Sequence, residues 1–268
     1  MFFVDVLTAA RLEMAQAWRA THYARARLEQ QPDPQGDTLT IGGAQVIYAG
    51  ATAPVNRAIG VGMAEPASIP ALEAIEEFYA VRRAPVRIDL CPLADAALVK
   101  LLAGRGYALE RFSTILAARL PAAESAAPPE VRVTQATPAE AQRWLTVVAQ
   151  GFDEQDQPQE ATLQVLYPNF FAANAHTFFA WIGDEPAGGG GMYLHGGVAE
   201  LGGASTRLAY RKRGVQAALL QQRMAAAYSL GCDLAMVMTT PGTVSQRNVQ
   251  RAGFAVAYTK VTMARQIT

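Results

Sequence analysis

The chain has 268 residues, of which 51% are hydrophobic and 17% are charged, and its formal net charge is zero with a pI of about 6.8. This is enough apolar material for one large core or two ordinary ones. A neutral chain has no overall electrostatic attraction to nucleic acid or to an anionic membrane, so neither is expected as a partner and any anion site must be local.

The first half of the chain contains a predicted helix from Ile69 to Val81. A strand-like run from Val86 to Leu90 and a second helix from Ala94 to Ala103 follow it. A Gly106-Tyr107 pair then leads into another strand-like run from Phe112 to Ala118. The expected order in this half is therefore helix, strand, helix, strand.

Small residues and prolines occupy the middle of the chain, from Pro121 to Pro129, and none of them has a side chain suited to a core. Such a composition is typical of a linker. We therefore expect a linker at 122–129 that separates a domain at 1–121 from a domain at 130–268.

The second half opens with a strand-like run and a clear helix start, because Thr137 can cap a helix, Pro138 suits its first position and Glu140 adds an early acid. Apolar residues recur at helical spacing between Gly214 and Leu230, and Gly231 ends that segment. The expected order of elements is β-α-α-β-β-β-α-β-α-β. Their expected ranges are 131–136, 137–151, 161–174, 176–182, 187–194, 198–207, 214–230, 234–238, 245–252 and 256–263.

The order helix, strand, helix, strand occurs at the end of both halves, and Gly106-Tyr107 takes the place that Gly253-Phe254 takes in the second half. A repeated unit of this kind is hard to obtain by chance, so the pattern indicates a duplicated domain. The expected fold class is α/β, of the α+β kind with mixed sheets, in which each of two tandem domains has a central mixed β-sheet flanked by helices.

A basic, glycine-containing turn joins a predicted strand to the helix at 214–230. The first N–H groups of a helix have no intrahelical partner and lie at the positive end of its dipole, so a phosphate placed there accepts several hydrogen bonds. Gly214 lets the backbone approach closely. The cations expected beside it are Arg207, Arg211, Lys212 and Arg213. The turn is therefore predicted to bind a pyrophosphate.

At this turn the chain resembles the GNAT superfamily of N-acetyltransferases, whose coenzyme A signature has Arg or Gln, two residues, Gly, one residue, and then Gly or Ala. Arg211 and Gly214 fit the signature, whereas Gln216 departs from it. The short helix that ends in Gly253-Phe254 is a second match. The resemblance covers 131–268 by order of elements, and it implies two tandem GNAT-like domains similar to those of tandem bacterial GNAT proteins.

The N-terminal half is similar to this family only in its order of elements, because it lacks the basic turn. Its corresponding helix carries Glu73, Glu76 and Glu77, which we expect to repel a phosphate. The domain at 1–121 is therefore expected to be a degenerate copy without a cofactor motif, which covers the sheet and shapes the acceptor site.

The resemblance implies acetyl-coenzyme A (acetyl-CoA) as cosubstrate and a primary amine of a small molecule or peptide as the acceptor, which attacks the thioester directly. Amides of 213–218 would hold the pyrophosphate, and amides near Leu208 and Ala209, where the strand leaves its neighbour, would orient the thioester. Asn248 and Ser245 would lie along the pantetheine; the alternatives are a helix cap for Ser245 and an ordinary surface position for Asn248. The cofactor-binding residues expected are Leu208, Ala209, Arg211, Lys212, Arg213, Gly214, Val215, Gln216, Ala217, Ala218 and Asn248.

For catalysis the resemblance points to Glu200, on the strand where GNAT enzymes often keep a carboxylate that accepts the amine proton through water. The alternative is a solvated strand residue, since strand faces alternate. Val249 stands where the family usually has a tyrosine that protonates the thiolate. The candidates for donating this proton in its place are Tyr258, Ser245 and Tyr210. Alternatively, each of these three residues has an ordinary core or rim position. The thiolate can also leave unprotonated.

Two further segments have open interpretations. The run from Gly188 to Gly191 either lets a strand bend or leaves room for a ligand against the backbone. The acidic loop from Phe152 to Asp156 either attracts a cationic acceptor or is an ordinary solvated loop.

Other features limit the classes of function. Cys91 and Cys232 are too few for a disulfide scaffold and lack the spacing of a zinc site, and the three histidines show no metal-ligand spacing, so no metal is expected. Asp5 interrupts the N-terminus and no apolar run approaches ~18 residues, which predicts a soluble cytoplasmic protein. A homodimer stays open. So do a non-catalytic acyl-CoA-binding or sensing function, favoured by Gln216 and Val249, and a purely structural one.

Overall fold

A computed structural model describes residues 3–122 and 130–266 of the chain. The expected linker at 122–129 lies, apart from Ala122, outside the described residues. Contacts divide the chain into two compact units. Unit 1 holds the described residues up to Ile115, Met238–Thr243 and the described residues from Val256 on, and unit 2 holds Leu116–Val237 and Val244–Ala255.

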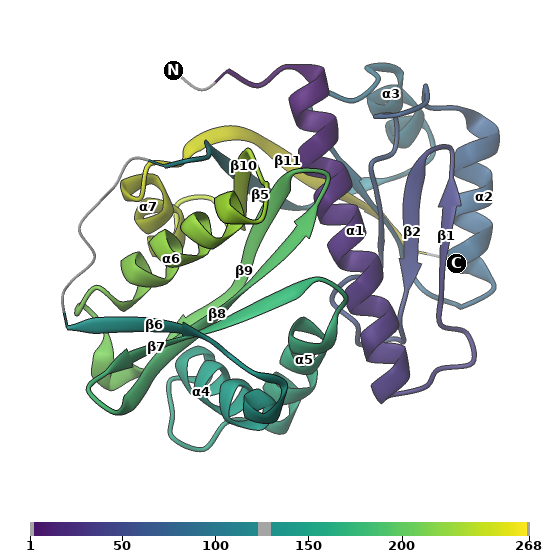
Figure 1. Ribbon diagram of the computed structural model, residues 1–268. Coiled ribbons are helices and arrows are strands. Elements are labelled where there is room, and N and C mark those ends of the chain that lie inside the picture. The colour runs from purple at the N-terminus through teal and green to yellow at the C-terminus, as the bar shows by residue number, and fades with distance from the viewer. Residues whose placement is uncertain (1–2, 123–129, 267–268) are drawn as a thin grey trace. The chain divides into compact units, whose positions relative to one another are not determined.

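Unit 1 combines three helices with strands from both ends of the chain (Figure 1). Its elements are α1 (Val6–Gln30), β1 (Asp37–Ile41), β2 (Ala44–Tyr48), β3 (Arg57–Ile59), α2 (Ile69–Ala80), β4 (Val86–Leu90), α3 (Ala97–Gly104), the first part of β5 (Ala108–Arg119) and β11 (Ala255–Arg265). The strands lie in the order β1-β2-β3-β4-β11-β5. All described pairs in this unit are antiparallel except β3 with β4, which is parallel.

The two faces of the unit 1 sheet follow the alternation of a strand. Val46 and Tyr48 of β2 pack in the cluster formed with α2 and α3, whereas Ile47 packs in the cluster formed with α1. Because successive side chains of a strand point to opposite faces, α1 covers one face and α2 and α3 cover the other. The face of α1 is built from small residues, among them Ala20 and Ala24.

Unit 2 has helices on both faces of a second mixed sheet, whose strands lie in the order β5-β10-β9-β8-β7-β6. Its elements are β6 (Val131–Gln135), the 3₁₀ turn η1 (Pro138–Glu140), α4 (Ala141–Asp153), α5 (Glu160–Phe171), β7 (Ala175–Ile182), β8 (Glu185–His195), β9 (Val198–Thr206), the 3₁₀ turn η2 (Leu208–Tyr210), α6 (Val215–Ser229), β10 (Leu234–Thr239) and α7 (Val244–Arg251). The expected α/β class, with mixed sheets flanked by helices, is confirmed.

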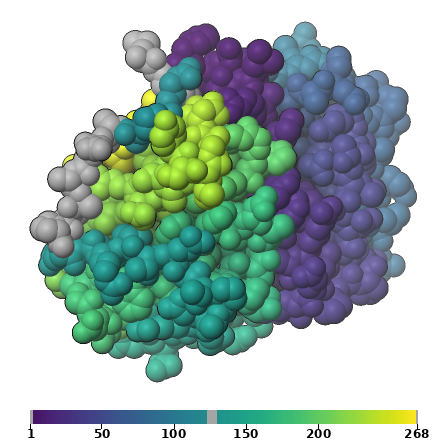
Figure 2. Space-filling model, in the orientation of Figure 1, coloured from purple at the N-terminus to yellow at the C-terminus, as the bar shows by residue number. Residues whose placement is uncertain are grey.

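Alternate residues of β7 show how the layers of unit 2 are built. Phe178 belongs to the cluster that contains α6, whereas Phe179 and Trp181 belong to the cluster that contains α4 and α5. The helices α6 and α4 therefore lie on opposite faces of the sheet, as the ribbon shows (Figure 1). In the space-filling view the teal edge strand β6 runs between the surfaces of these two helices (Figure 2).

Local sequence signals explain where the elements of unit 2 begin and end. The capping box is present, because the backbone N–H and the hydroxyl of Thr137 both donate to Glu140, at 2.9 and 2.8 Å. Gly183 and Gly231 adopt positive φ, which glycine allows at a turn and at a helix end. The expected order β-α-α-β-β-β-α-β-α-β is confirmed, with boundaries within about three residues of the expected ones.

The structure corrects the expected place of the last strand. We expected the strand at 256–263 to close the second domain, but β11 belongs to unit 1, where it pairs with β4 from Val261↔Leu90 to Arg265↔Val86. In return β5, the last strand of the first half, contributes its residues from Leu116 on to unit 2, beside β10. Each half of the sequence thus supplies one strand to the other unit.

Buried charges hold β11 in unit 1. Lys260 lies 2.9 Å from Glu13 on α1 and 3.3 Å from Asp89 on β4, and the Asp89 carboxylate also lies 3.7 Å from Arg57. The hydroxyls of Tyr258 and Thr262 donate to Glu13 and Asp89, each at 2.7 Å. Burial alone would raise the pKa of Asp89, but Lys260 and Arg57 outweigh it and hold that pKa below its ordinary value.

Candidate functional site

The turn between β9 and α6 has the geometry of an anion site. Lys212 and Gly214 both adopt positive φ, of 62° and 77°, and α6 begins at Val215 directly after them. No side chain caps this end of α6, and no acidic residue lies in its first turn. The first amides of α6 therefore remain available to an anion placed at the positive end of the helix dipole.

Most of the basic side chains of this turn are engaged within unit 2. Three of the four expected cations are paired: Arg207 with Glu185 at 3.8 Å, Arg211 with Glu154 at 2.8 Å and Arg213 with Glu130 at 2.9 Å. The hydrogen bond that Arg213 donates to Glu130 raises the pKa of Arg213. Lys212 is exposed and has no ion-pair partner within the described ranges. The free backbone amides, rather than the paired basic side chains, are therefore the main donors that this turn offers to an anion.

Next to the turn, β9 separates from β10. The parallel register between these strands runs from Val198↔Leu234 to Glu200↔Met236, whereas β9 continues to Thr206. The backbone of β9 from Leu201 on is thus available for hydrogen bonds to an extended ligand. We expected this edge near Leu208 and Ala209, but these two residues lie in the 3₁₀ turn η2, after the strand has ended.

Glu200 occupies the last position of β9 that pairs with β10. It is 1% exposed, so the alternative of a solvated strand residue is wrong. In the antiparallel register with β8 it lies opposite Tyr193, and residues directly opposite each other share a face of the sheet. The Tyr193 hydroxyl donates toward the backbone oxygen and Oδ1 of Asn169 on α5, at 3.0 and 3.1 Å. Glu200 therefore lies on the face that α5 covers.

The other expected site residues divide into exposed and buried ones. Those of the turn and of α7 that reach the surface fully or partly are Leu208, Ala209, Tyr210, Gln216, Ala217, Ser245 and Asn248. Val215 and Ala218 are buried in the core beneath the turn. Tyr258 lies in unit 1, where its hydroxyl is bonded to Glu13 and where burial raises its pKa.

The run from Gly188 to Gly191 makes the middle of β8 thin. A Cβ on Gly189 would lie 2.9 Å from Val148 and 3.0 Å from Trp144, and a Cβ on Gly190 would lie 3.0 Å from the guanidinium of Arg223. The glycines therefore let α4 on one face and α6 on the other approach the strand closely. Opposite them the register of β9 shifts, between Gly189↔Ser205 and Gly191↔Gly202, which is a β-bulge in β9.

The comparisons with known proteins agree with this geometry. Residues 140–254 match the model of the Acetyltransferase (GNAT) family. This range contains the turn, β9, β10, α6 and α7. Residues 140–254 form a GNAT-family domain. No curated protein matches the chain.

Solved structures extend the likeness to the whole chain at the level of the fold. The chain is similar to a GCN5-related N-acetyltransferase from Kribbella flavida, with 19% identity, a TM-score of 0.66 and coverage of 97% of this chain and 96% of that one. It is also similar to a tandem GNAT protein from the clavulanic acid biosynthesis pathway, with 12% identity, a TM-score of 0.58 and coverage of 91% and 87%. The expected resemblance to tandem GNAT proteins is confirmed.

The corresponding helix of unit 1 lacks the open N-terminus found in the GNAT domain. The hydroxyl of Ser68 accepts from the amide of Ala71 at 3.3 Å, and the carboxylate of Asp95 accepts from the amide of Ala67 at 3.0 Å. An internal carboxylate thus takes the place of an external anion at α2. Glu76, further along α2, pairs with Arg105 at 2.6 Å, and the repulsion expected from Glu73, Glu76 and Glu77 stays a prediction.

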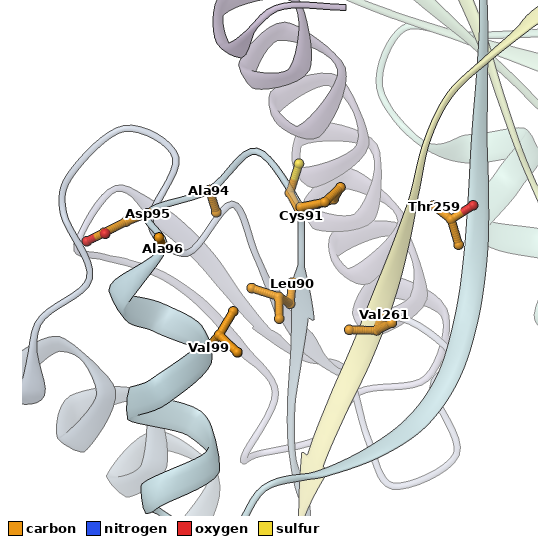
Figure 3. A pocket seen from close by; sticks show the side chains of 9 residues that line it. Leu90, Cys91, Ala94, Asp95, Ala96, Val99, Thr259 and Val261 are labelled. Atoms are coloured by element: carbon orange, nitrogen blue, oxygen red, sulfur yellow. The ribbon is translucent and has the colours of Figure 1, made fainter.

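Unit 1 also contains a pocket of about 360 Å³, which lies between β4, α3 and β11 (Figure 3). Its walls are mainly apolar, and Figure 3 shows Leu90 between Val99 and Val261. The one carboxylate that lines it, that of Asp95, already accepts the amides of Ala67 and Ala97. No basic side chain lines this pocket, so its chemistry does not suit a pyrophosphate.

The acidic loop has a structural role in the GNAT domain. Asp153 accepts from the amide of Gln159 and the hydroxyl of Thr162, both at 2.7 Å, and Glu154 pairs with Arg211.

Among the described residues, no group of three His, Cys, Asp or Glu side chains could hold a metal ion. None of the described helices combines the length and apolar character needed to cross a membrane.

Proposed function

We propose that the GNAT domain transfers an acetyl group from acetyl-CoA to a primary amine of a small molecule or peptide, by direct attack of the amine. One observation carries this proposal. The open N-terminus of α6 follows the turn at 207–214, which comes directly after β9, and the register of β9 with β10 ends at Glu200. One end of this arrangement suits a pyrophosphate, and the exposed strand edge suits an extended arm with amide groups.

Each part of the turn has a role in this proposal. The amides of 213–218 would donate hydrogen bonds to the pyrophosphate. Gly214 would allow the close approach, and Gln216 would add a side-chain donor where the family signature has a smaller residue. The backbone of β9 from Leu201 on would bind the pantetheine amides. Asn248 and Ser245 would contact the pantetheine from α7, on which both reach the surface.

When bound, acetyl-CoA supplies an activated acyl carbon whose leaving group is a thiolate. Glu200 would accept the proton of the attacking amine through water, because it is the carboxylate of β9 at the point where the strands separate. Val249 is buried and has no proton to give, and Tyr258 is engaged in unit 1. We therefore assign the role of general acid to neither residue. The remaining candidates for this role are the exposed Ser245 and the partly exposed Tyr210.

A non-catalytic acyl-CoA-binding or sensing protein is the second candidate, favoured by Gln216 and Val249. Titration calorimetry with acetyl-CoA, followed by a thiol-release assay over a panel of primary amines, tests both. We expect saturable binding and amine-dependent release of thiol. Binding without release for any amine would favour the sensor, and the absence of any binding would refute both functions.

A further inference from the structure

Arg223 is a buried cation of the GNAT domain that has no role in the proposed pyrophosphate turn or in the proposed proton transfer to Glu200. It lies on α6 and is 1% exposed. Its Nε donates to the backbone oxygen of Leu219 at 3.0 Å, and its Nη1 donates to that of Gly191 at 2.9 Å. No carboxylate lies within ion-pair distance of it among the described residues. Burying an arginine without a counter-ion is costly, so its position calls for a reason.

The charge is retained despite this environment. Burial lowers the pKa of Arg223 to about 10, which leaves the guanidinium protonated at neutral pH. Tyr193, on β8, is the titratable group that acts on it electrostatically, and Glu200 lies opposite Tyr193 in the β8–β9 register. The arginine therefore places a positive charge beneath the sheet at this point.

The glycine run brings the guanidinium against the backbone of β8. A Cβ on Gly190 would lie 3.0 Å from the Cζ and Nη1 of Arg223, so a larger residue there would displace the group. Gly191, whose oxygen Arg223 binds, lies opposite Gly202 of β9. Gly202 is two residues beyond Glu200, where the register with β10 ends. Only the width of β9, about 4.8 Å per strand, separates this level of β8 from the open strand edge.

In the proposed reaction the amine nitrogen bonds to the thioester carbonyl carbon, and the C–S bond breaks with its electron pair left on sulfur. The amine proton passes to the base. A proton or a nearby cation stabilises the thiolate so formed, and Val249 stands where the family usually has the tyrosine that supplies the proton. An arm held at its pyrophosphate by α6 and extended along β9 would pass Gly202, the level at which Arg223 binds β8, with its sulfur toward Glu200.

We propose that the buried guanidinium of Arg223 stabilises the negative charge that develops at this sulfur. It does so through the sheet, without contact, because a charge in a site of low polarity acts over several ångströms. Arg223 thus acts through its electric field and touches neither the substrate nor the cofactor. In this way it compensates for the absent tyrosine. This inference rests on the proposed function.

The pKa of the thiol of bound CoA tests the inference without turnover. It is measured from the ultraviolet absorbance of the thiolate as the complex of the protein with unacylated CoA is titrated over pH. We expect the pKa of the bound thiol to lie about one unit below that of CoA in the same buffer. Arg223→Met should remove this shift, and Arg223→Lys should keep most of it. Arg27→Met is the matched control, because Arg27 in unit 1 is also buried and also donates to a backbone oxygen, that of Ala49.

The outcomes separate the inference from the proposed function. A bound thiol with the pKa of free CoA, or a lowered pKa that persists in Arg223→Met, would overturn the role of Arg223 while leaving cofactor binding intact. Failure of the wild-type protein to bind CoA would overturn both proposals. Should Arg223→Met not fold, the wild-type shift and its retention in Arg223→Lys decide the matter. Acetyl transfer should also fall about tenfold in Arg223→Met, the rate equivalent of one pKa unit.

Discussion

Replacing Lys260 with methionine is expected to destabilise unit 1 by about 3–5 kcal/mol, the cost typical of breaking a buried ion pair by removing one partner. The buried cluster contains two carboxylates, Glu13 and Asp89, and two cations, Lys260 and Arg57, so its formal charge is zero. All four residues are at most 9% exposed. The substitution leaves one buried negative charge that no remaining cation neutralises.

Thermal unfolding monitored by fluorescence measures this effect, and we expect the melting temperature to fall by on the order of 10 °C. Lys100→Met is the matched control, because Lys100 is exposed on α3, and it should change stability by less than about 0.5 kcal/mol. The double variant Lys260→Met with Glu13→Gln restores neutrality, so it should be more stable than Lys260→Met alone.

The pH dependence gives a second test of the same reasoning. In the wild-type protein the lowered pKa of Asp89 contributes stability that is present above its unfolded-state value and is lost as the pH falls through the folded-state value. In Lys260→Met a stranded carboxylate can instead bind a proton. The difference in stability between the two proteins should therefore shrink from about pH 7 to about pH 5. A constant difference, or a double variant no more stable than the single one, would refute the account.

Three further predictions concern the GNAT domain. Gly214→Asp should weaken CoA binding about a hundredfold in calorimetry, because it puts a carboxylate at the proposed pyrophosphate position. The control Gly106→Asp, at a glycine of unit 1 with the same φ of 77°, should leave the affinity unchanged. Equal affinities of the two variants would contradict the assignment. Glu200→Gln should lower the acetylation rate up to about a hundredfold near neutral pH and less at high pH, and an unchanged pH profile would exclude Glu200 as base. Gly188→Ala should lower the melting temperature, because its Cβ would lie 2.4 Å from the oxygen of Ser205, whereas Gly104→Ala has open space and should be neutral; equal melting temperatures would show that the packing at β8 adapts.

Local signals in the sequence were sufficient for the order of the helices and strands in the second half, although not for the unit that the last strand joins. Thr137 and Glu140 form the capping box that their spacing predicts, and the alternation along β7 places its aromatic residues on two faces. The basic turn after β9 was recognisable because glycine, basic residues and the start of an apolar helical stripe coincide there. The roles expected for its residues remain predictions.

The first 60 residues could not be assigned in the same way. The face of α1 in contact with the sheet is built mostly from alanines, and its buried side includes the charged Glu13 and Arg27, so the contrast between an apolar and a polar face is weak. The partners of these charges lie far away in the sequence: Lys260 reaches Glu13 across 247 positions. Long-range pairing of this kind leaves no local signal.

The same limit applies to the site. Arg223 falls within the regular stripe of α6, and only its packing beneath Gly190 distinguishes it from an exposed arginine of a helix. Asn169 and Tyr193 come together through the packing of α5 on β8. The run of four glycines was the one available hint, because it signals close approach without saying what approaches.

The exchanged strands also bear on biosynthesis and on evolution. Unit 1 receives β11 from residues 255–265, so a ribosome must synthesise this late segment before the sheet of that unit can close. A gene split between the two halves of the sequence would yield two products, each lacking a strand that the other encodes. A recombinant fragment that ends between the two halves would therefore be incomplete.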